Sequence, residues 1–234
     1  MVVRDAACRW PADWKWQATD GAAATPVATR DEEWLAAWLV GRCAPAEPSE
    51  IAFLQYTSGS TGHPKGVMVG TRNLLANIDA IAQTRLCHAK MSSVGVERVA
   101  VCSWLPQYHD MGLIGGCLTA AVRGWRADLT SPFTFLQRPA VWLQMMTRLK
   151  ETHLLMQPAP NFGYALCVRR IKDDALSKLS LSHWHIAMNG AEPIRAQTIQ
   201  DFSARFAACG FDPRAWAPVF GLAENCLYCC GRAE

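Results

Sequence analysis

Short apolar runs alternate with amphipathic segments along most of this 234-residue chain. The apolar runs have the length of strands, and they lie near residues 51–56, 98–104, 154–157, 184–188 and 215–220. Helical patterns of apolar residues lie between them, near residues 72–86, 111–122, 138–150 and 194–208. This alternation predicts an α/β fold, with a largely parallel sheet flanked by helices and ligand-binding loops at the strand ends.

The first apolar run leads into a loop rich in glycine and hydroxyl side chains. We expect Ile51–Tyr56 to be a short buried strand, and Thr71 stands where the N-cap of the following helix is expected. From Tyr56 to Gly66 the sequence is YTSGSTGHPKG. Glycines let the backbone approach a ligand closely, hydroxyls donate hydrogen bonds to phosphate oxygens, and Lys65 adds a positive charge. The composition predicts a phosphate-binding loop between a strand and a helix.

Two alternatives compete for this loop. A Walker A loop requires the order G-x-x-x-x-G-K-[ST], but here Lys65 precedes Gly66, and Val67 and Met68 follow where Ser or Thr is needed. The loop is therefore not that of a P-loop NTPase. The other alternative, a plain flexible surface loop, is typical of short Ser/Gly/Thr clusters.

Three further polar blocks follow apolar runs later in the chain. They are WLPQYHDMGL at Trp104–Leu113, NGAEP at Asn189–Pro193 and FGLAE at Phe220–Glu224. Junctions between a strand and the next element commonly line binding sites in α/β proteins. The plain alternative for the second block is a helix start, with Pro193 in its first turn.

Together these four blocks, in this order, resemble the signature motifs of the adenylate-forming (AMP-binding) enzymes. This superfamily includes acyl-CoA synthetases, luciferases and nonribosomal peptide adenylation domains. The resemblance covers about residues 50–230 and implies that the fold is part of the large N-terminal domain of such an enzyme. It also implies that ATP is a substrate and Mg²⁺ a cofactor, with a carboxylate attacking the α-phosphorus to give an acyl-adenylate and pyrophosphate.

The resemblance assigns roles to individual residues. Lys65 and His109 are the candidate catalytic residues, and Glu224 is the candidate Mg²⁺ ligand. Phe220 stands where the family usually has Tyr, so the ring can stack on adenine but the phenol hydroxyl is missing. The nucleotide-binding candidates are Thr57, Ser58, Gly59, Ser60, Thr61, Gly62, Asn189, Gly190, Ala191, Glu192, Phe220, Gly221, Leu222 and Ala223. The substrate-binding candidates are His109, Asp110, Met111, Gly112 and Phe162.

The sequences of two blocks resemble one branch of the superfamily. QYHDMGLIGG at Gln107–Gly116 and QPAPNFGYALC at Gln157–Cys167 are most similar to the fatty-acyl-AMP ligases. That branch implies transfer of a fatty acid to an acyl carrier protein or to a carrier domain of a polyketide synthase. An acyl-CoA synthetase, another acid-adenylating ligase, and a noncatalytic protein that binds nucleotide or acyl groups remain as alternatives.

The resemblance also bears on domain organisation. We expect residues 1–45 to be an N-terminal segment shorter than the family's own, and residues 46–234 to be part of the AMP-binding domain. The family's ribose-binding Asp and its small C-terminal domain with a catalytic Lys have no counterpart in this sequence. We therefore expect the chain alone to be weakly active or inactive.

Composition narrows the partners and the compartment. The net charge of +3 is too small to argue for nucleic acid as a partner. No stretch approaches the ~18 to 20 apolar residues that a membrane span needs. Charges near the first residue also argue against a signal peptide, so we expect a cytoplasmic protein. An acidic carrier protein is the partner that the family implies.

Overall fold

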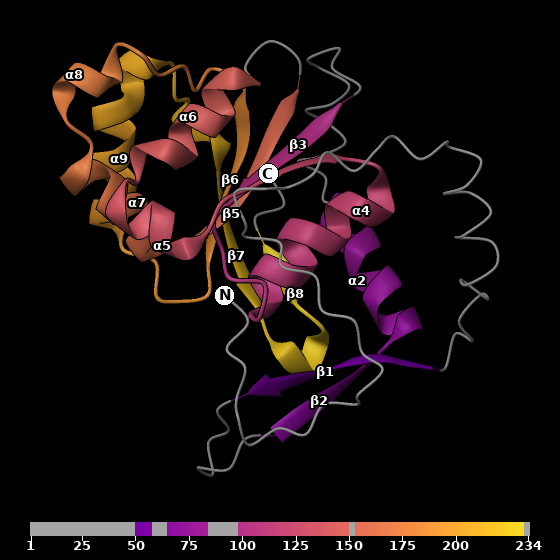
Figure 1. Ribbon diagram of the computed structural model, residues 1–234. Helices are drawn as coiled ribbons and strands as arrows, with labels where there is room; N and C mark the ends of the chain where they lie inside the picture. The colour runs from indigo at the N-terminus through magenta and orange to yellow at the C-terminus, as the bar shows by residue number, and fades with distance from the viewer. Residues whose placement is uncertain (1–49, 58–64, 84–97, 150–152, 232–234) are drawn as a thin grey trace, which may run out of the picture. The chain divides into compact units, whose positions relative to one another are not determined.

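A computed structural model describes residues 50–57, 65–83, 98–149 and 153–231 of the chain, and Figure 1 shows their arrangement. The main element is a six-stranded sheet with the strand order β4-β3-β5-β6-β7-β8. Its strands are β3 (Val99–Ser103), β4 (Arg126–Leu129), β5 (Leu154–Pro160), β6 (Trp184–Gly190), β7 (Trp216–Gly221) and β8 (Tyr228–Gly231). All neighbours pair in parallel except β7 and β8, which confirms the predicted largely parallel α/β fold.

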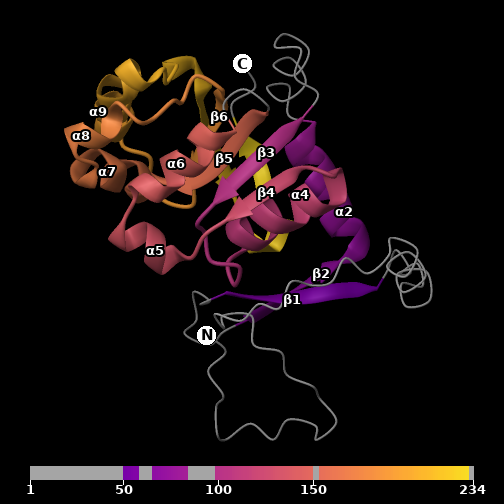
Figure 2. The same cartoon turned by 45° about the horizontal axis from the view of Figure 1, so that its top comes forward.

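The sheet is covered by helices on both faces, as Figures 1 and 2 show. One face carries α5 (Pro132–Gln137), α6 (Ala140–Arg148), α7 (Asn161–Arg170) and α9 (Ala196–Phe206). The other carries α2 (Thr71–Ala82) and the continuous pair η1 (Met111–Leu118) and α4 (Thr119–Arg123). Shorter helices are α8 (Asp173–Leu176), η2 (Ala207–Cys209), η3 (Pro213–Ala215) and η4 (Ala223–Asn225). No helix that the structure describes is long and apolar enough to cross a bilayer.

Alternation along the strands divides the apolar residues between two cores. In β3, Ala100 and Cys102 pack beneath α5, α6 and α7, whereas Val99 and Val101 pack beneath α2 and η1. Successive strand residues point to opposite faces, so a strand buried on both faces is a continuous apolar run. This explains why the runs in the sequence identified these strands correctly.

Aromatic rings fill the core beneath α5, α6, α7 and α9. Trp142 is fully buried, and its ring meets those of Phe135, Tyr164 and Trp184 edge to face at centroid distances of 5.8, 5.6 and 5.2 Å. Trp104 stacks on Phe135 at 3.9 Å. Such edge and stacked contacts add to the hydrophobic stabilisation that burial provides. The core therefore anchors Trp104, the first residue after β3 in the block that carries His109.

The strand order reverses between β3 and β5. After β3 the chain passes through η1 and α4 on one face to reach β4, and it then returns through α5 and α6 on the other face to β5. Ligands of open α/β sheets bind beyond the carboxyl ends of the strands at such a switch point. The topology thus marks the carboxyl ends of β3 and β5 as the place to look for a site.

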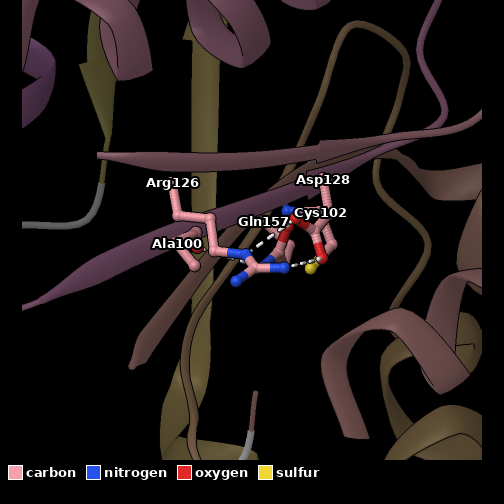
Figure 3. Close-up of polar contacts among 5 residues, drawn as sticks. All are labelled: Ala100, Cys102, Arg126, Asp128 and Gln157. Atoms are coloured by element: carbon pink, nitrogen blue, oxygen red, sulfur yellow. Dashed lines mark hydrogen bonds and ion pairs between the residues drawn. The ribbon is translucent and has the colours of Figure 1, made fainter. Parts of the chain in front are cut away.

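Side chains replace ladder hydrogen bonds where β3 and β5 separate, as Figure 3 shows. The two strands pair only through Val99 with Leu154 and Ala100 with Leu155. Beyond these pairs, the buried Gln157 amide accepts a hydrogen bond from Cys102 N–H and donates one of 3.3 Å to the Ala100 carbonyl. Trp142 Nε1 donates to the Cys102 carbonyl at 2.8 Å. The end of β3 is therefore held although the ladder has opened.

A two-stranded antiparallel sheet lies outside this arrangement and corrects the expectation for the first strand. It comprises β1 (Ile51–Thr57) and β2 (Lys65–Gly70), and Thr57 is the register partner of Lys65. β1 is a strand as predicted, but it is not buried, because Ile51, Leu54 and Tyr56 are 55, 48 and 65% exposed.

The elements around the predicted phosphate loop also differ from expectation. The loop was expected to join a strand to a helix, whereas Lys65 begins the unpredicted strand β2, and helix α2 follows only at Thr71. The N-cap of α2 is Gly70, and Thr71 is its first helical residue. The short run Val67–Val69 is rich in β-branched residues, and this signal could have identified β2.

The other predicted helices are present at the predicted positions, but one of them is not an α-helix throughout. The segment predicted as one helix over 111–122 begins as a π-helix, in which Thr119 N–H bonds to the Ile114 carbonyl five residues earlier. Helices α5 and α7 and strands β4 and β8 were not predicted. Helix α5 has a recognisable start, because Ser131 Oγ accepts a hydrogen bond from Thr134 N–H at 3.0 Å and Pro132 follows the cap.

Candidate functional site

A cavity of about 680 Å³ opens at the carboxyl ends of the sheet strands. Its lining comes from β1, from the segment after β3, from β5 and β6, and from the region between β7 and β8. The lining residues are Gln55, Tyr56, Thr57, Ile81, Tyr108, His109, Asp110, Met111, Gly115, Met156, Pro158, Met188, Ala191, Val219, Phe220, Gly221, Leu222, Ala223, Glu224, Leu227 and Tyr228. Polar groups thus share the cavity with a mostly apolar wall.

All four sequence blocks contribute to this one cavity. The candidate residues that the structure brings together there are Thr57, His109, Asp110, Met111, Ala191, Phe220, Gly221, Leu222, Ala223 and Glu224. Candidates Ser58, Gly59, Ser60, Thr61 and Gly62 lie outside the described residues. Segments more than a hundred residues apart in the sequence therefore meet at the strand ends.

Several candidates lie beside the cavity without lining it. Lys65 is exposed at the start of β2, opposite Thr57. Phe162 contacts the edge of Trp104 at 5.5 Å, and its N–H donates to the Glu192 carboxylate. Asn189 is fully buried in β6, and within the described part of the chain its side-chain amide has no hydrogen-bond partner.

Two candidate glycines have a packing role that the structure makes plain. A Cβ on Gly112 would lie 2.1 Å from the Pro106 carbonyl oxygen, and a Cβ on Gly190 would lie 2.6 Å from the Val219 carbonyl oxygen. Both distances are far shorter than a van der Waals contact, and the atoms approached belong to the backbone, which cannot move aside as a side chain can. These glycines let the block after β3 fold back on itself and let β6 approach β7, and so they shape the cavity indirectly.

His109 and Asp110 form a polar pair at the cavity mouth. His109 Nδ1 lies 2.7 Å from Asp110 Oδ1, which also accepts a 2.6 Å hydrogen bond from Met111 N–H. The hydrogen bond to Asp110 raises the pKa of His109 above its ordinary value, while partial burial works in the opposite direction. With Nδ1 bonded to the carboxylate, Nε2 is the ring nitrogen left to meet a ligand.

The segment that carries Glu224 is fixed from the neighbouring helix. Asn77 in α2 donates to the carbonyls of Asn225 and Tyr228 at 3.1 and 2.9 Å, and its Oδ1 accepts from Tyr228 N–H at 2.9 Å. Cys226 has φ 69° and ψ −60°, and Leu227 N–H bonds to the Asn225 carbonyl at 2.8 Å. These are the features of a tight γ-turn, which is rare and strained. The braced turn positions Glu224 at the cavity.

Ala191 is the second described non-glycine residue with a positive φ. Its φ is 64°, and it lies directly after β6, where the NGAEP block reaches the cavity. A left-handed backbone at an alanine costs roughly 1–2 kcal/mol. Strain of this kind commonly persists where a backbone segment is held for ligand contact. Ala191 is thus a position of backbone strain in the cavity lining.

Most of the apolar lining was missed by reasoning from the sequence. Met156 from β5, Met188 from β6 and Leu227 before β8 lie outside the quoted blocks, and Pro158 of β5 lies in the QPAPNFGYALC block without being named as a site residue. Their alternation with core residues is the only available signal, since Leu155 and Ala187 face the opposite core. In a strand buried on both faces, that alternation does not distinguish a cavity wall from a core. Tyr108 and Gly115 lay inside or next to predicted blocks.

The sequence matches a family described as AMP-binding enzyme over residues 10–234. Among relatives, it is 41% identical over 186 residues to the medium-chain-fatty-acid--[acyl-carrier-protein] ligase TtuA of Teredinibacter turnerae, covering 80% of this chain and 27% of TtuA. It is 42% identical over 179 residues to the putative fatty-acid--CoA ligase fadD25 of Mycobacterium tuberculosis, covering 76% of this chain and 30% of fadD25.

The structure is also similar to one with bound ligands. The fatty acyl-adenylate ligase from L. pneumophila, in complex with acyl adenylate and pyrophosphate, superposes with a TM-score of 0.68 at 44% identity. The similarity covers 76% of this chain and 29% of that one. The chain thus spans about 30% of the length of the relatives that it matches.

Proposed function

The chain belongs to the AMP-binding enzyme family, and on that premise we propose that it takes part in the ATP-dependent activation of a fatty acid to an acyl-adenylate. The activated acyl group then passes to the phosphopantetheine thiol of an acyl carrier protein or of a polyketide synthase carrier domain. ATP as the substrate is consistent with a cytoplasmic reaction. Because the chain spans about 30% of its relatives, the activity is proposed for the whole enzyme to which these residues correspond.

The convergence of the four sequence blocks on one cavity is the observation that carries this proposal. Thr57, His109, Ala191 and Glu224 come from separate segments, yet all line the same hollow at the strand switch point. The apolar wall formed by Met111, Met156 and Met188 would suit an acyl chain, since methionine side chains adapt to irregular apolar ligands.

His109 would receive the carboxylate of the acid. Its pKa is raised by Asp110, so the protonated ring is more populated near neutral pH than in an ordinary histidine. A protonated imidazole would attract the carboxylate and hold it toward the nucleotide. Asp110 keeps the ring orientation fixed through the 2.7 Å contact at Nδ1. In this role His109 orients a reactant and transfers no proton in the adenylation step.

The nucleotide would occupy the polar side of the cavity. Thr57 and Lys65 are register partners at the two strand ends that flank the residues 58–64, so a phosphate there would meet a hydroxyl and an ammonium group. The exposed ring of Phe220 offers a stacking surface for adenine, and the backbone at Ala191 offers it polar groups. Together these groups would separate the base from the phosphates.

Glu224 would bind Mg²⁺ together with the nucleotide. Among the residues that the structure describes, no cluster of three or more His, Cys, Asp or Glu side chains could hold a metal alone. Mg²⁺ commonly binds through one or two carboxylates plus phosphate oxygens and water. A single exposed carboxylate at the cavity fits that chemistry. When bound, the ion would neutralise the charge that develops on the departing pyrophosphate.

The two proposed steps balance in atoms and charge. A carboxylate oxygen forms a bond to the α-phosphorus, the bond to the bridging oxygen breaks, and pyrophosphate leaves with its electron pair. The carrier thiol then attacks the acyl carbon, a thioester forms, AMP leaves as the phosphate anion, and the thiol proton passes to solvent. Both steps depend on positioning and charge stabilisation rather than on a covalent enzyme intermediate.

Calorimetric binding of an acyl-adenylate analogue tests the proposal on the chain as it exists. The probe would be dodecanoyl adenosine with a sulfamoyl group in place of the phosphate. We expect binding by the wild-type chain and at least about tenfold weaker binding by His109→Ala, because the substitution removes a charge-assisted contact worth roughly 1.5–3 kcal/mol. His153→Ala is the matched control, since His153 does not line the cavity.

Absence of analogue binding both by the wild-type chain and by an enzyme of full family length that carries these residues would overturn the proposal. Fatty-acid-dependent exchange of labelled pyrophosphate into ATP then separates activation from binding. An enzyme of full family length that carries these residues should catalyse the exchange. Analogue binding without any exchange in such an enzyme would favour the noncatalytic alternative.

A further inference from the structure

Helix α5 turns two large apolar side chains away from the protein. Phe133 and Leu136 are 68 and 46% exposed, and their i, i+3 spacing puts them on one side of this six-residue helix. The opposite side is anchored, because Phe135 is fully buried and stacked on Trp104. An isolated helix this short is unstable in water, so packing through Phe135 holds it in place. The exposed pair is therefore presented rigidly.

Basic residues lie at the C-terminal end of α5 and in the last turn of α7, which contacts α5. Arg138 caps the C-terminal end of α5, and Arg170 in the last turn of α7 donates to the Leu136 carbonyl at 3.4 Å, next to the exposed Arg169. Between residues 129 and 172 the described part of the chain contains no Asp or Glu. Within that part, no carboxylate pairs with these three arginines. We call Phe133, Leu136, Arg138, Arg169 and Arg170 the α5 patch.

The α5 patch is connected to the cavity through Trp104. This residue stacks on Phe135 of α5 on one side, and on the other it begins the segment that carries His109 and Asp110 to the cavity mouth. A partner seated on the exposed side of α5 would thus contact a helix that packs through Phe135 on Trp104, the residue that begins the segment with His109. An acceptor whose flexible arm must enter the cavity needs a docking surface of this kind close to the entrance.

We propose that the α5 patch is the docking surface for the acceptor of the acyl group, a carrier protein that presents an acidic face with an apolar centre. This inference rests on the proposed function, and it adds the location and the chemistry of the acceptor contact. The arginines complement the acidic face and increase the association rate, while Phe133 and Leu136 supply the buried centre. Arginine and aromatic side chains are typical of the residues that dominate interface affinity.

The dimensions of the patch favour a protein partner over a lipid surface. Helix α5 is about 9 Å long, because its six residues rise by about 1.5 Å each. Helices that lie in a membrane interface generally have a long apolar face along several turns. Two side chains with a basic border match the centre and rim of a small transient protein interface more closely.

Fluorescence anisotropy with matched variants tests this inference on the full 234-residue chain. The probe is a fluorescently labelled acyl carrier protein from Teredinibacter turnerae, in the apo form, so that docking is measured without the arm. We expect Phe133→Ala to weaken binding about tenfold and Leu136→Ala or Arg138→Glu about fivefold, with the effect of Arg138→Glu shrinking at high salt.

Two control variants carry the same types of substitution at residues outside the α5 patch. Leu75 in α2 is 44% exposed, close to the value for Leu136, so Leu75→Ala removes the same side chain on the other face of the sheet. Arg148 ends α6, roughly 13 Å along that helix from its start beside Arg138, so Arg148→Glu makes the same charge change outside the patch. Both controls should change binding less than about twofold.

Three results would overturn the docking inference. They are no carrier binding by the wild-type chain, equal losses in the patch and control variants, and Phe133-dependent binding to vesicles of equal phosphatidylglycerol and phosphatidylcholine in place of the carrier. Binding of the acyl-adenylate analogue is measured in parallel and should be unchanged in every patch variant. If analogue binding persists while carrier docking fails, the docking inference alone is wrong and the activation proposal stands.

Discussion

The six-stranded sheet and the β1–β2 hairpin expose their apolar side chains to opposite degrees. All five residues of β3 are buried, whereas β1 has none that is fully buried and leaves Ile51, Leu54 and Tyr56 about half exposed or more. Yet both regions line the cavity, the first through β5 and β6 and the second through Gln55, Tyr56 and Thr57. The contrast predicts that the cavity is lined both by strands that stabilise the fold and by a hairpin that contributes little to stability.

The difference in burial between the sheet and the hairpin has a physical reason. A two-stranded antiparallel sheet is marginal by itself, because it buries too little apolar surface to offset the conformational entropy lost on ordering. The parallel sheet instead buries apolar side chains on both faces beneath helices. Substitutions in the sheet core should therefore unfold the protein, and substitutions in the hairpin should change binding while leaving stability nearly intact.

The largest expected effect is at Trp142, and it tests the stability half of the comparison. Trp142→Ala should lower the free energy of unfolding by about 3–5 kcal/mol, because it leaves a cavity among several rings and removes the bond to the Cys102 carbonyl. Urea denaturation followed by circular dichroism measures the loss. Trp142→Phe keeps most of the ring volume and should cost less. An unchanged denaturation midpoint for Trp142→Ala would show that this core does not dominate stability.

A smaller effect is expected at Gln157, where the sheet opens toward the cavity. Gln157→Leu has a similar volume but leaves Cys102 N–H and the Ala100 carbonyl without their side-chain partner. An unsatisfied buried polar group costs about 1–3 kcal/mol, so a loss in that range is expected in the same denaturation experiment. Gln200→Leu, on the exposed side of α9, is the control and should be neutral. Equal losses in both variants would contradict the proposed bridge.

The hairpin should respond much less to a comparable truncation. Leu54→Ala removes an apolar side chain that is 48% exposed, and we expect a change in unfolding free energy within about 0.5 kcal/mol. The fully buried Leu143→Ala provides the matched comparison and should cost about 2–5 kcal/mol. If the two truncations lower the unfolding free energy equally, the hairpin contributes to stability as much as the core does, and the two regions do not differ.

The smallest expected effect on stability concerns the pair His109 and Asp110, and it is a pH dependence. The pKa of His109 is raised above the ordinary value of 6.5 mainly by its hydrogen bond to Asp110. Its contribution to stability is therefore fully present below pH 6.5 and is lost as the pH rises through the higher folded-state pKa. In Asp110→Asn the pKa of His109 should fall, as measured by NMR titration of its ring protons. A pKa that is unchanged in this variant would show that Asp110 is not the cause.

Reasoning from the sequence predicted the largely parallel α/β fold correctly, and the structure places His109, Asp110 and the FGLAE block, all quoted from the sequence, at one cavity. The fold could be predicted because buried strands form continuous apolar runs, and the blocks could be found because they follow these runs directly. The strand β2 was missed because Val67–Val69 lies between two glycines in a region interpreted as a loop. Helix α5 was missed because six residues are too few to show a helical period, although Ser131 and Pro132 mark its start.

The cavity wall was the least predictable part of the site. Met156 and Met188 are apolar residues in strands buried on both faces, so their sequence context is the same as that of core residues. Whether such a residue faces a core or a cavity depends on which helices cover the sheet at that point. The exposure of β1 was unpredictable for the same reason, since an apolar run does not reveal whether another element packs against it.

The number of residues in the π-helical segment Met111–Leu118 determines which of its side chains face the cavity. Its wider turn accommodates residues that an α-helix of the same length would arrange differently, and Met111 and Gly115 reach the cavity in that winding. Deleting one residue would let the segment rewind as an α-helix and turn the following side chains by roughly 100° about its axis. A one-residue deletion, which an exposed loop would tolerate, would thus move the lining side chains of this segment out of the cavity, although the remaining residues keep their identity.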